Sequence, residues 1–291
     1  MTGSGWSATV AEMPVEAWRW VLRTSADNLG PIVNLYKPYV DGLEHLRPDG
    51  RFLIVGNHTM FSAAEILLIP YFVRHHIGKR VRPLADRQFG KMPKPQRDVM
   101  TAFGGVVGSP DTASALMDEG ETILVFPGGG REIPKFQGEE YTLRWQNRSG
   151  FARIAIKHQY PIVTAALVGG DDVVTSVGTR DSALGRLSTA LGRLGGREDM
   201  AMPILRGLGP TPLPRPQRMY LRFGPAIETA RPKRVTPLDW TAVVKDRVQD
   251  QLENDLADLL ALRESDPYRH LNPLRWRSAV LPESPVRHEG A

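Results

Sequence analysis

Short apolar runs alternate with amphipathic segments along the chain from residue 51 onward. The runs are rich in Val, Ile and Leu and end at turn residues, which is typical of strands buried in a sheet. We predict strands over 51–55, 81–84, 122–126, 161–168 and 219–223. Apolar residues at helical spacing between these runs predict helices over 63–72, 111–117 and 149–158, the first disturbed by Pro70. The alternation predicts an α/β fold with a mainly parallel sheet flanked by helices.

A longer amphipathic pattern follows the last predicted strand. Thr236 and Asp239 are spaced as a helix start, with Pro237 between them. Apolar residues then recur at helical spacing, at Trp240, Val244, Val248, Leu252, Leu256 and Leu259. We therefore divide the chain into three parts: an N-terminal helical segment (1–42), an α/β domain (43–265) that includes a C-terminal packing helix (237–264), and a polar tail (266–291).

Two segments allow two interpretations each. The helix predicted after Pro14 carries Trp18 and Trp20, which suit either packing on the domain or anchoring at a membrane interface. The segment 184–194 repeats Leu-Gly-Arg-Leu after seven residues, so on a helix its leucines share one side, flanked by arginines. This helix either covers the sheet or serves as a lid or a membrane contact beside the site.

Composition excludes several classes of chemistry. The 291 residues contain no cysteine, which excludes disulfides, thiol nucleophiles and cysteine-ligated zinc. No Gly-x-Ser-x-Gly is present, so a serine nucleophile elbow is not supported. We expect no metal site and no resident cofactor. A formal charge of +5 and a pI of about 9.5 favour anionic partners, but no module for binding nucleic acid is recognisable, and we expect none to be bound.

Hydropathy provides no candidate for a membrane-spanning helix. The longest apolar stretch, 66–73, contains a proline and is much shorter than the ~20 residues that a bilayer requires. The N-terminus shows no charged-then-apolar signal pattern. From the sequence we expect a cytoplasmic protein that attaches peripherally to the inner face of the membrane.

Two motifs carry the candidate chemistry, and each one follows a predicted strand. Asn57-His58 comes directly after the first strand, at the sheet edge where ligands bind in open α/β folds. A lone histidine there would more often be structural. The second motif, 126–132, places three glycines and a cation after another strand, where backbone N–H groups can approach a ligand. Its residues are Phe126, Pro127, Gly128, Gly129, Gly130, Arg131 and Glu132.

Together the two motifs resemble the lysophospholipid/glycerolipid acyltransferase superfamily, and within it the diacylglycerol-acyltransferase-like branch that includes phytyl ester synthase-type domains. His58 stands where the family has the histidine of its His-x4-Asp block. Segment 126–132 stands where most members have Phe-Pro-Glu-Gly-Thr-Arg and where this branch has Pro-Gly-Gly-x-Arg-Glu. The resemblance covers roughly residues 43–229. It implies that the basic loop 86–97 lines the substrate site, although a solvated loop fits the residues equally well.

The chain departs from the family pattern at one important position. Where the aspartate would stand, five residues after His58, it has Ala63, and the nearest acid is Glu65. A longer spacer or a kinked helix start could still bring Glu65 to the imidazole.

The resemblance implies acyl transfer from a thioester, acyl-CoA or acyl carrier protein, to a lipid hydroxyl such as that of a mono- or diacylglycerol or a lysophospholipid. His58 would be the general base, assisted by Glu65, and no acyl-enzyme would form. Asn57 and segment 126–132 would bind substrate, with the glycine N–H groups facing the oxyanion and Glu132 or Glu65 orienting His58 or Arg131. The alternative is a non-catalytic lipid-binding protein with the same fold.

Overall fold

The computed structural model describes residues 37–61, 63–86, 104–194 and 201–270, together with Gly30, Val33 and Thr101. The helix predicted after Pro14 and most of the basic loop 86–97 lie outside these residues.

A seven-stranded sheet organises the molecule, with the strand order β1-β9-β6-β2-β5-β3-β4. Its strands are β1 Tyr39–Asp41, β2 Leu53–Gly56, β3 Val81–Ala85, β4 Val106–Val107, β5 Thr122–Val125, β6 Ile162–Val168 and β9 Tyr220–Phe223. Every neighbouring pair is parallel except β6 with β9. The predicted α/β fold with a mainly parallel sheet is therefore confirmed.

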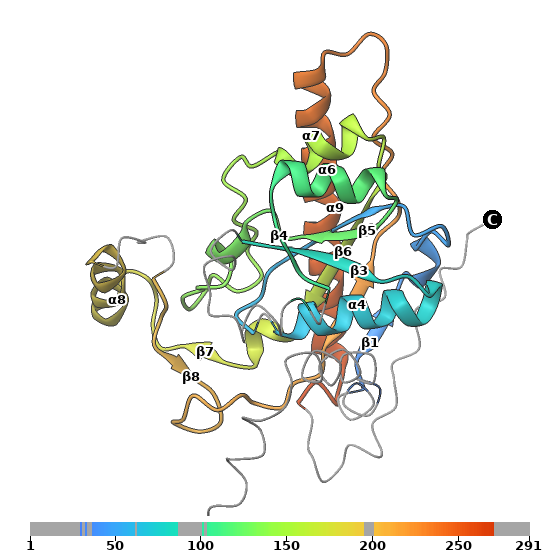
Figure 1. Cartoon of the computed structure of the whole chain (residues 1–291). Helices are drawn as coiled ribbons and strands as arrows, with labels where there is room; N and C mark the ends of the chain where they lie inside the picture. Colours follow the sequence, from blue (N-terminus) through green and yellow to red (C-terminus); the bar gives the residue numbers. More distant parts are fainter. Residues whose placement is uncertain are drawn as a thin grey trace, which may run out of the picture.

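Helices cover both faces of this sheet (Figure 1). One core packs α6 Pro110–Asp118, α7 Gly150–Lys157 and α9 Pro237–Ser265 against strand residues such as Leu53 and Val55. The other core packs α4 Ala63–Ile77 against Phe52 and Ile54. Alternate residues of β2 thus enter opposite cores, which explains why the strand is apolar throughout.

Two long helices compare differently with the prediction. In α9, Thr236 caps the N-terminus by accepting the Asp239 N–H, and the predicted apolar positions are buried. In α4, the expected disturbance at Pro70 was wrong, because the helix continues to Ile77. A proline removes one helical hydrogen bond, and here burial of Ile69 and Val73 on either side of it stabilises the helix.

Both predicted domain boundaries need correction. β1 lies within the segment assigned to residues 1–42, yet it pairs with β9 as an edge strand of the sheet. At the other end, Asp266 was placed in the tail, but its buried carboxylate accepts hydrogen bonds from Arg218 at 2.8 Å and Tyr220 at 2.5 Å. Isolated residues at the ends of an element give no pattern that reveals such long-range partners.

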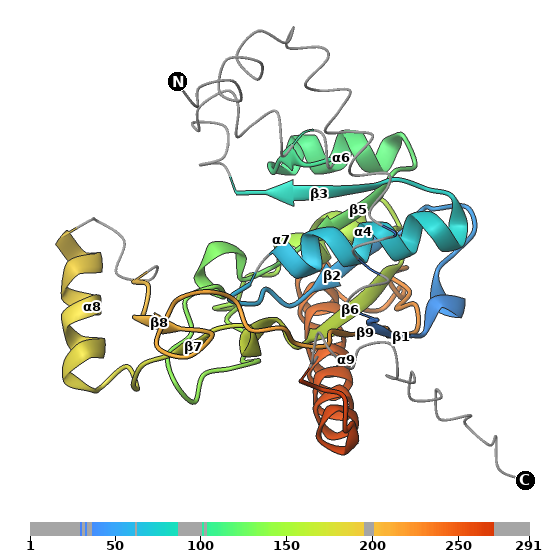
Figure 2. The ribbon, with the colours of Figure 1, turned by 90° about the horizontal axis from the view of Figure 1, so that it is seen from below.

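Between β6 and β9 the chain makes an excursion that we call the α8 arm, residues 173–217. It contains β7 Thr175–Ser176, α8 Ala183–Leu194 and β8 Leu205–Arg206, and β7 and β8 pair antiparallel. Figures 1 and 2 show α8 standing apart from the helices that cover the sheet. Because the arm leaves and returns at one edge of the sheet, β9 must run opposite to β6. The alternative in which this helix covers the sheet is wrong.

None of the helices in the described ranges is long and apolar enough to cross a membrane.

Candidate functional site

The two sequence motifs meet at the carboxyl edge of the sheet. β2 and β5 are parallel neighbours, with Val55 opposite Val125, so the residues that follow them lie side by side. The rings of His58 and Phe126 are stacked, with centroids 4.5 Å apart and planes at 12°. The structure therefore places His58 against the first residue of the glycine motif.

Glu65 reaches the imidazole in this structure. Its Oε1 lies 2.6 Å from Nδ1 of His58 and also accepts the Thr59 backbone N–H at 2.8 Å. Its Oε2 accepts the Thr59 hydroxyl at 2.9 Å. A carboxylate accepts hydrogen bonds, so Nδ1 carries the proton and Nε2 is the nitrogen left to accept another. The Glu65 side chain is fully buried, whereas that of His58 keeps 11% exposure.

The geometry explains why the family's spacing fails here. Residues 60 and 61 form a turn and α4 begins at Ala63, which is exposed. An acid at position 63 would therefore face away from His58. Glu65, in the first turn of α4, faces inward, where the helix N-terminus also favours a negative charge. The catalytic role of the pair stays a prediction.

Glu132 supports the backbone of the histidine and not its ring. Its Oε2 accepts the His58 N–H at 3.0 Å, and its Oε1 accepts the Arg144 N–H at 2.9 Å. Burial raises the pKa of the Glu132 carboxyl, although these two N–H groups and the charge of Lys135 act in the opposite direction. We reassign Glu132 from substrate binding to positioning of His58.

The carboxyl group of Glu132 fills space beside Gly128. A Cβ at residue 128 would lie 2.3 Å from Cγ and 2.5 Å from Cδ of Glu132, so any side chain there would collide with it. Gly128 has φ −70° and ψ −26°, a backbone conformation open to every residue. Most members of the resembled family have a glutamate at this position. In this chain the carboxylate comes from residue 132 and occupies the volume of a side chain on residue 128.

A buried ion pair that sequence reasoning missed lies on the other side of the histidine. Lys135 Nζ donates to the backbone carbonyl of His58 at 2.7 Å and to Asp171 Oδ2 at 2.8 Å. Asp171 also accepts the N–H groups of Met60 at 2.7 Å and Tyr141 at 2.8 Å. The available signal was Gly169-Gly170-Asp171-Asp172, which directly follows β6 at the same edge of the sheet.

Asn57 also holds the backbone. Its Nδ2 donates to Leu167 O at 2.9 Å and its Oδ1 accepts from Leu167 N at 2.8 Å, which ties the end of β2 to β6. The side chain is buried. We therefore reassign Asn57 from substrate binding to positioning of the residue that follows it, His58.

The glycine motif forms a single 3-10 turn, η3 Gly129–Arg131. The Gly129 N–H donates to Phe126 O at 2.9 Å, so this donor is already used within the turn. Arg148 donates to the carbonyl oxygens of Pro127 and Gly128 at 3.3 and 3.1 Å and holds the loop from outside. Arg131 Nη1 donates to Gln146 at 2.9 Å.

Comparison with known proteins relates part of the chain to a family. A model of the acyltransferase family matches residues 37–168. The match begins before β1, ends with β6, and contains both motifs of the site.

Curated relatives extend the similarity beyond these residues. Two chloroplastic proteins of Arabidopsis thaliana are similar to 79–80% of the chain: phytyl ester synthase 2 at 29% identity and phytyl ester synthase 1 at 31%. A Bos taurus protein named "DGAT1/2-independent enzyme synthesizing storage lipids" is 29% identical over 43% of the chain. The alignments cover 36%, 35% and 36% of these relatives, so the chain spans about a third of their length.

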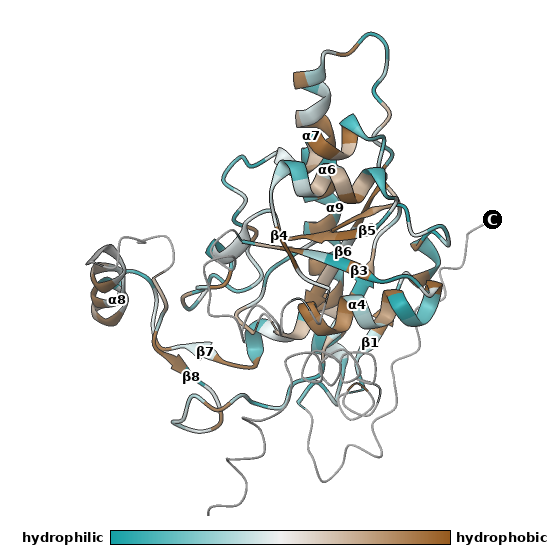
Figure 3. Cartoon of the chain, in the orientation of Figure 1, coloured by the Kyte–Doolittle hydropathy of each residue, from teal (hydrophilic) through white to brown (hydrophobic). Residues whose placement is uncertain are grey.

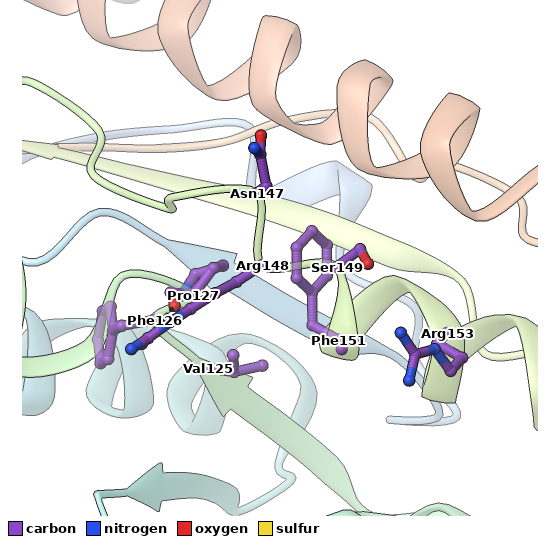
Figure 4. A pocket seen from close by; sticks show the side chains of 9 residues that line it. Val125, Phe126, Pro127, Asn147, Arg148, Ser149, Phe151 and Arg153 are labelled. Atoms are coloured by element: carbon purple, nitrogen blue, oxygen red, sulfur yellow. Dashed lines mark hydrogen bonds between the residues drawn. The ribbon is translucent and has the colours of Figure 1, made fainter. Parts of the chain in front are cut away.

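A pocket of about 460 Å³ opens beside Phe126 (Figure 4). It lies between the end of β5 and the start of α7, and is lined by Val125, Phe126, Pro127, Asn147, Arg148, Ser149, Gly150, Phe151 and Arg153. Apolar side chains, two arginines and the first residues of a helix therefore share one hollow. Such a lining suits a molecule with an apolar part and an anionic end.

We predict that a glutamate at position 128 can replace the carboxylate of Glu132 when residue 132 is made glycine. Glu132→Gly leaves the buried N–H of His58 and the half-buried N–H of Arg144 without an acceptor, which should cost about 1–3 kcal/mol for the buried group. Gly128→Glu alone overpacks the site and should cost about 1–3 kcal/mol. The double variant should lose less free energy of unfolding than the two single variants lose together. The difference, measured by urea unfolding, should be about 1 kcal/mol or more.

The matched control for this cycle is Gly128→Gln with Glu132→Gly, which restores volume without the carboxylate. It should recover less stability than the glutamate, because an amide offers one acceptor oxygen in place of two. Strictly additive losses in the glutamate cycle would show that the two positions do not share this space.

Proposed function

We propose that the chain is an O-acyltransferase that moves an acyl group from a thioester to the hydroxyl of a lipid. The buried pair of His58 and Glu65 carries this proposal, because its Nδ1 contact leaves Nε2 as the ring nitrogen that can take up a proton. The family whose model matches residues 37–168 supports acyl transfer. The names of the relatives, phytyl ester synthases and a storage-lipid enzyme, support a lipid acceptor.

In the proposed reaction, Nε2 of His58 accepts the proton of the acceptor hydroxyl as its oxygen attacks the thioester carbonyl. The tetrahedral intermediate collapses, the carbon–sulfur bond breaks, and the thiolate leaves with the proton from the imidazolium. Glu65 fixes the tautomer and stabilises the imidazolium while it exists. The N–H groups of Gly128 and Gly130 are the donors that we assign to the oxyanion, since Gly129 already donates to Phe126 O.

Charges around His58 favour this proton transfer. Three buried carboxylates, those of Glu65, Glu132 and Asp171, accompany one buried ammonium group, that of Lys135. A positive charge on the imidazole therefore arises in surroundings with an excess of acidic groups, where opposite charges stabilise it.

The pocket beside Phe126 is our candidate site for the donor. Acyl-CoA and acyl carrier protein both bear phosphate near the thioester arm, and Arg148 and Arg153 provide cations for it. The acceptor would come from a membrane surface, to which the protein attaches peripherally. The alternative is a lipid-binding protein without activity. Its main support is the aspartate missing at position 63, and the contact of Glu65 with the imidazole argues against it.

The direct test incubates the purified protein with a lipid extract and labelled acyl-CoA or acyl carrier protein. The proposal expects labelled esters that depend on the protein. Stable lipid binding without any label in esters would instead establish the alternative.

We predict that His58→Ala lowers turnover by about 10²–10⁴, because the reaction loses its general base. The variant should keep its far-UV circular dichroism spectrum. Near-complete turnover by this folded variant would remove His58 from the mechanism.

We predict that Glu65→Gln lowers kcat by about a hundredfold, because the imidazole loses the carboxylate that fixes its tautomer and stabilises the imidazolium. Adding Ala63→Asp should restore nothing, since residue 63 is exposed. Glu132→Gln, measured alongside, should reduce kcat less than Glu65→Gln, because Glu132 contacts the backbone of His58 and not its ring. An unchanged rate in Glu65→Gln would leave His58 unassisted by this residue.

We predict that Arg153→Glu raises KM for the thioester donor about tenfold or more with a smaller effect on kcat, because a donor phosphate would meet an acid. Lys157→Glu is the matched control, since it makes the same charge change on α7 outside the pocket lining. Equal effects of the two changes on KM would argue against a donor site in this pocket.

A further inference from the structure

The α8 arm carries most of the large apolar side chains that the described residues expose. They are Val177, Leu184, Leu187, Leu191, Met202, Ile204, Leu208 and Leu213, and only Leu238 and Val243 of α9 complete that set. In Figure 3, β8 and bands of α8 are coloured as hydrophobic. Contiguous apolar groups on a surface mark an interaction site.

Helix α8 packs with its polar side inward. Gly185 is buried, Ser188 and Thr189 are half-buried, and the Ser188 hydroxyl donates to the Met202 carbonyl on the returning chain. A Cβ at Gly185 would lie 2.3 Å from Thr179 O, so only glycine allows α8 to lie this close to the segment that precedes it.

The leucines of α8 point the other way. Leu184, Leu187 and Leu191 are 42, 56 and 60% exposed, and their spacing of three and four residues places them on one stripe. A helix that covers a protein core turns such a stripe inward. The helices that cover the sheet bury their apolar side, whereas α8 turns its apolar stripe away from the protein.

The arm is firmly attached next to the site. Arg180 donates to both oxygens of Glu139, at 2.8 and 3.0 Å, and its guanidinium lies over the ring of Phe136. Burial alone would raise the pKa of Glu139, but hydrogen bonds from Arg180, the Phe136 N–H and Arg144 lower it to about 2. Phe136 directly follows Lys135, which holds the His58 carbonyl. A partner of the arm is thereby placed at the carboxyl edge of the sheet.

The charge of the arm selects the kind of partner. Residues 173–217 contain six arginines and three acidic residues, a net charge of +3. Arg186 and Arg206 are exposed alongside the leucine-bearing elements. A leucine stripe bordered by arginines matches a bilayer, whose acyl chains take the leucines while anionic headgroups take the cations. Two copies of this chain paired through the same face in a two-fold contact would bring like arginines together.

We propose that the α8 arm docks on the surface of an anionic bilayer through Leu184, Leu187 and Leu191 and holds the carboxyl edge of the sheet at that surface. The choice of a bilayer rests in part on the lipid acceptor of the proposed function. Docking itself is measured without turnover, so an inactive protein that binds vesicles would refute the proposed function and leave this inference standing.

The test compares co-sedimentation with vesicles of phosphatidylcholine alone and of phosphatidylcholine mixed with an equal amount of phosphatidylglycerol. The wild type should bind the anionic vesicles at low salt and detach as salt rises. The triple variant Leu184→Gln, Leu187→Gln, Leu191→Gln should bind about a hundredfold more weakly. Leu238→Gln with Val243→Gln, which changes exposed apolar residues of α9, should bind like the wild type.

A label provides a second readout that does not depend on how the triple variant folds. The chain has no cysteine, so Leu187→Cys and Leu238→Cys each accept a single environment-sensitive fluorophore. Anionic vesicles should shift the emission to the blue at position 187 and leave position 238 unchanged.

Three results would overturn the proposal. The first is equal vesicle binding by the triple variant and the wild type. The second is an identical response of the two labels. The third is a wild-type dimer in analytical ultracentrifugation that becomes monomeric in the triple variant without vesicle binding by either, which would assign the leucine stripe to a second copy of the chain.

Discussion

The burial of the Glu65 carboxylate is the constraint on which the rest of the site depends. A carboxylate removed from water costs several kcal/mol unless hydrogen bonds replace its hydration. Here the imidazole of His58 and both polar groups of Thr59 provide them. Because these donors directly follow β2 and the acceptor opens α4, the carboxylate closes the strand-to-helix connection as it orients the ring. The same hydrogen bonds therefore fix the connection between β2 and α4 and orient the His58 ring. A change that disrupts the connection would also displace the ring.

The same reasoning explains how carboxylates can change position in sequence while their place in space is kept. Glu65 reaches the imidazole from a later position than the resembled family uses, because the turn before α4 exposes residue 63. Glu132 fills the space that a side chain on Gly128 would take. The site requires a carboxylate at a given point in space, where it accepts hydrogen bonds from the donors around it. The backbone path decides which residue can provide that carboxylate.

The difference between position in the sequence and position in space decides which features the sequence predicts. Strands such as β2 and β5 were predictable because strands buried on both faces are uniformly apolar, and α9 because its stripe is long and capped. His58 could be singled out because it follows such a strand and because a second motif, 126–132, follows another strand. The role of Asn57 could not, since its two hydrogen bonds reach Leu167 on a strand more than a hundred positions away. Lys135 and Asp171 were missed for the same reason: they become partners only when the edge of the sheet is assembled. The continuation of α4 past Pro70 depends on packing that local propensity does not describe.

The α8 arm differs from the rest of the fold in the side chains that its helix buries. Elsewhere the described helices bury their apolar faces, while α8 uses a glycine and small hydroxyl residues to pack and leaves its leucines outside. Its attachment through Arg180 and Glu139 ends at Phe136, next to the lysine that holds the backbone of His58. The arm is thus connected to the candidate base through a short series of contacts, from the half-buried Arg180–Glu139 pair to the buried Lys135. In the proposed docking, an acceptor lipid would present its hydroxyl to His58 while its acyl chains remain in the bilayer. The energetic cost of exposing leucines in the free protein would then be offset when the leucines enter the bilayer.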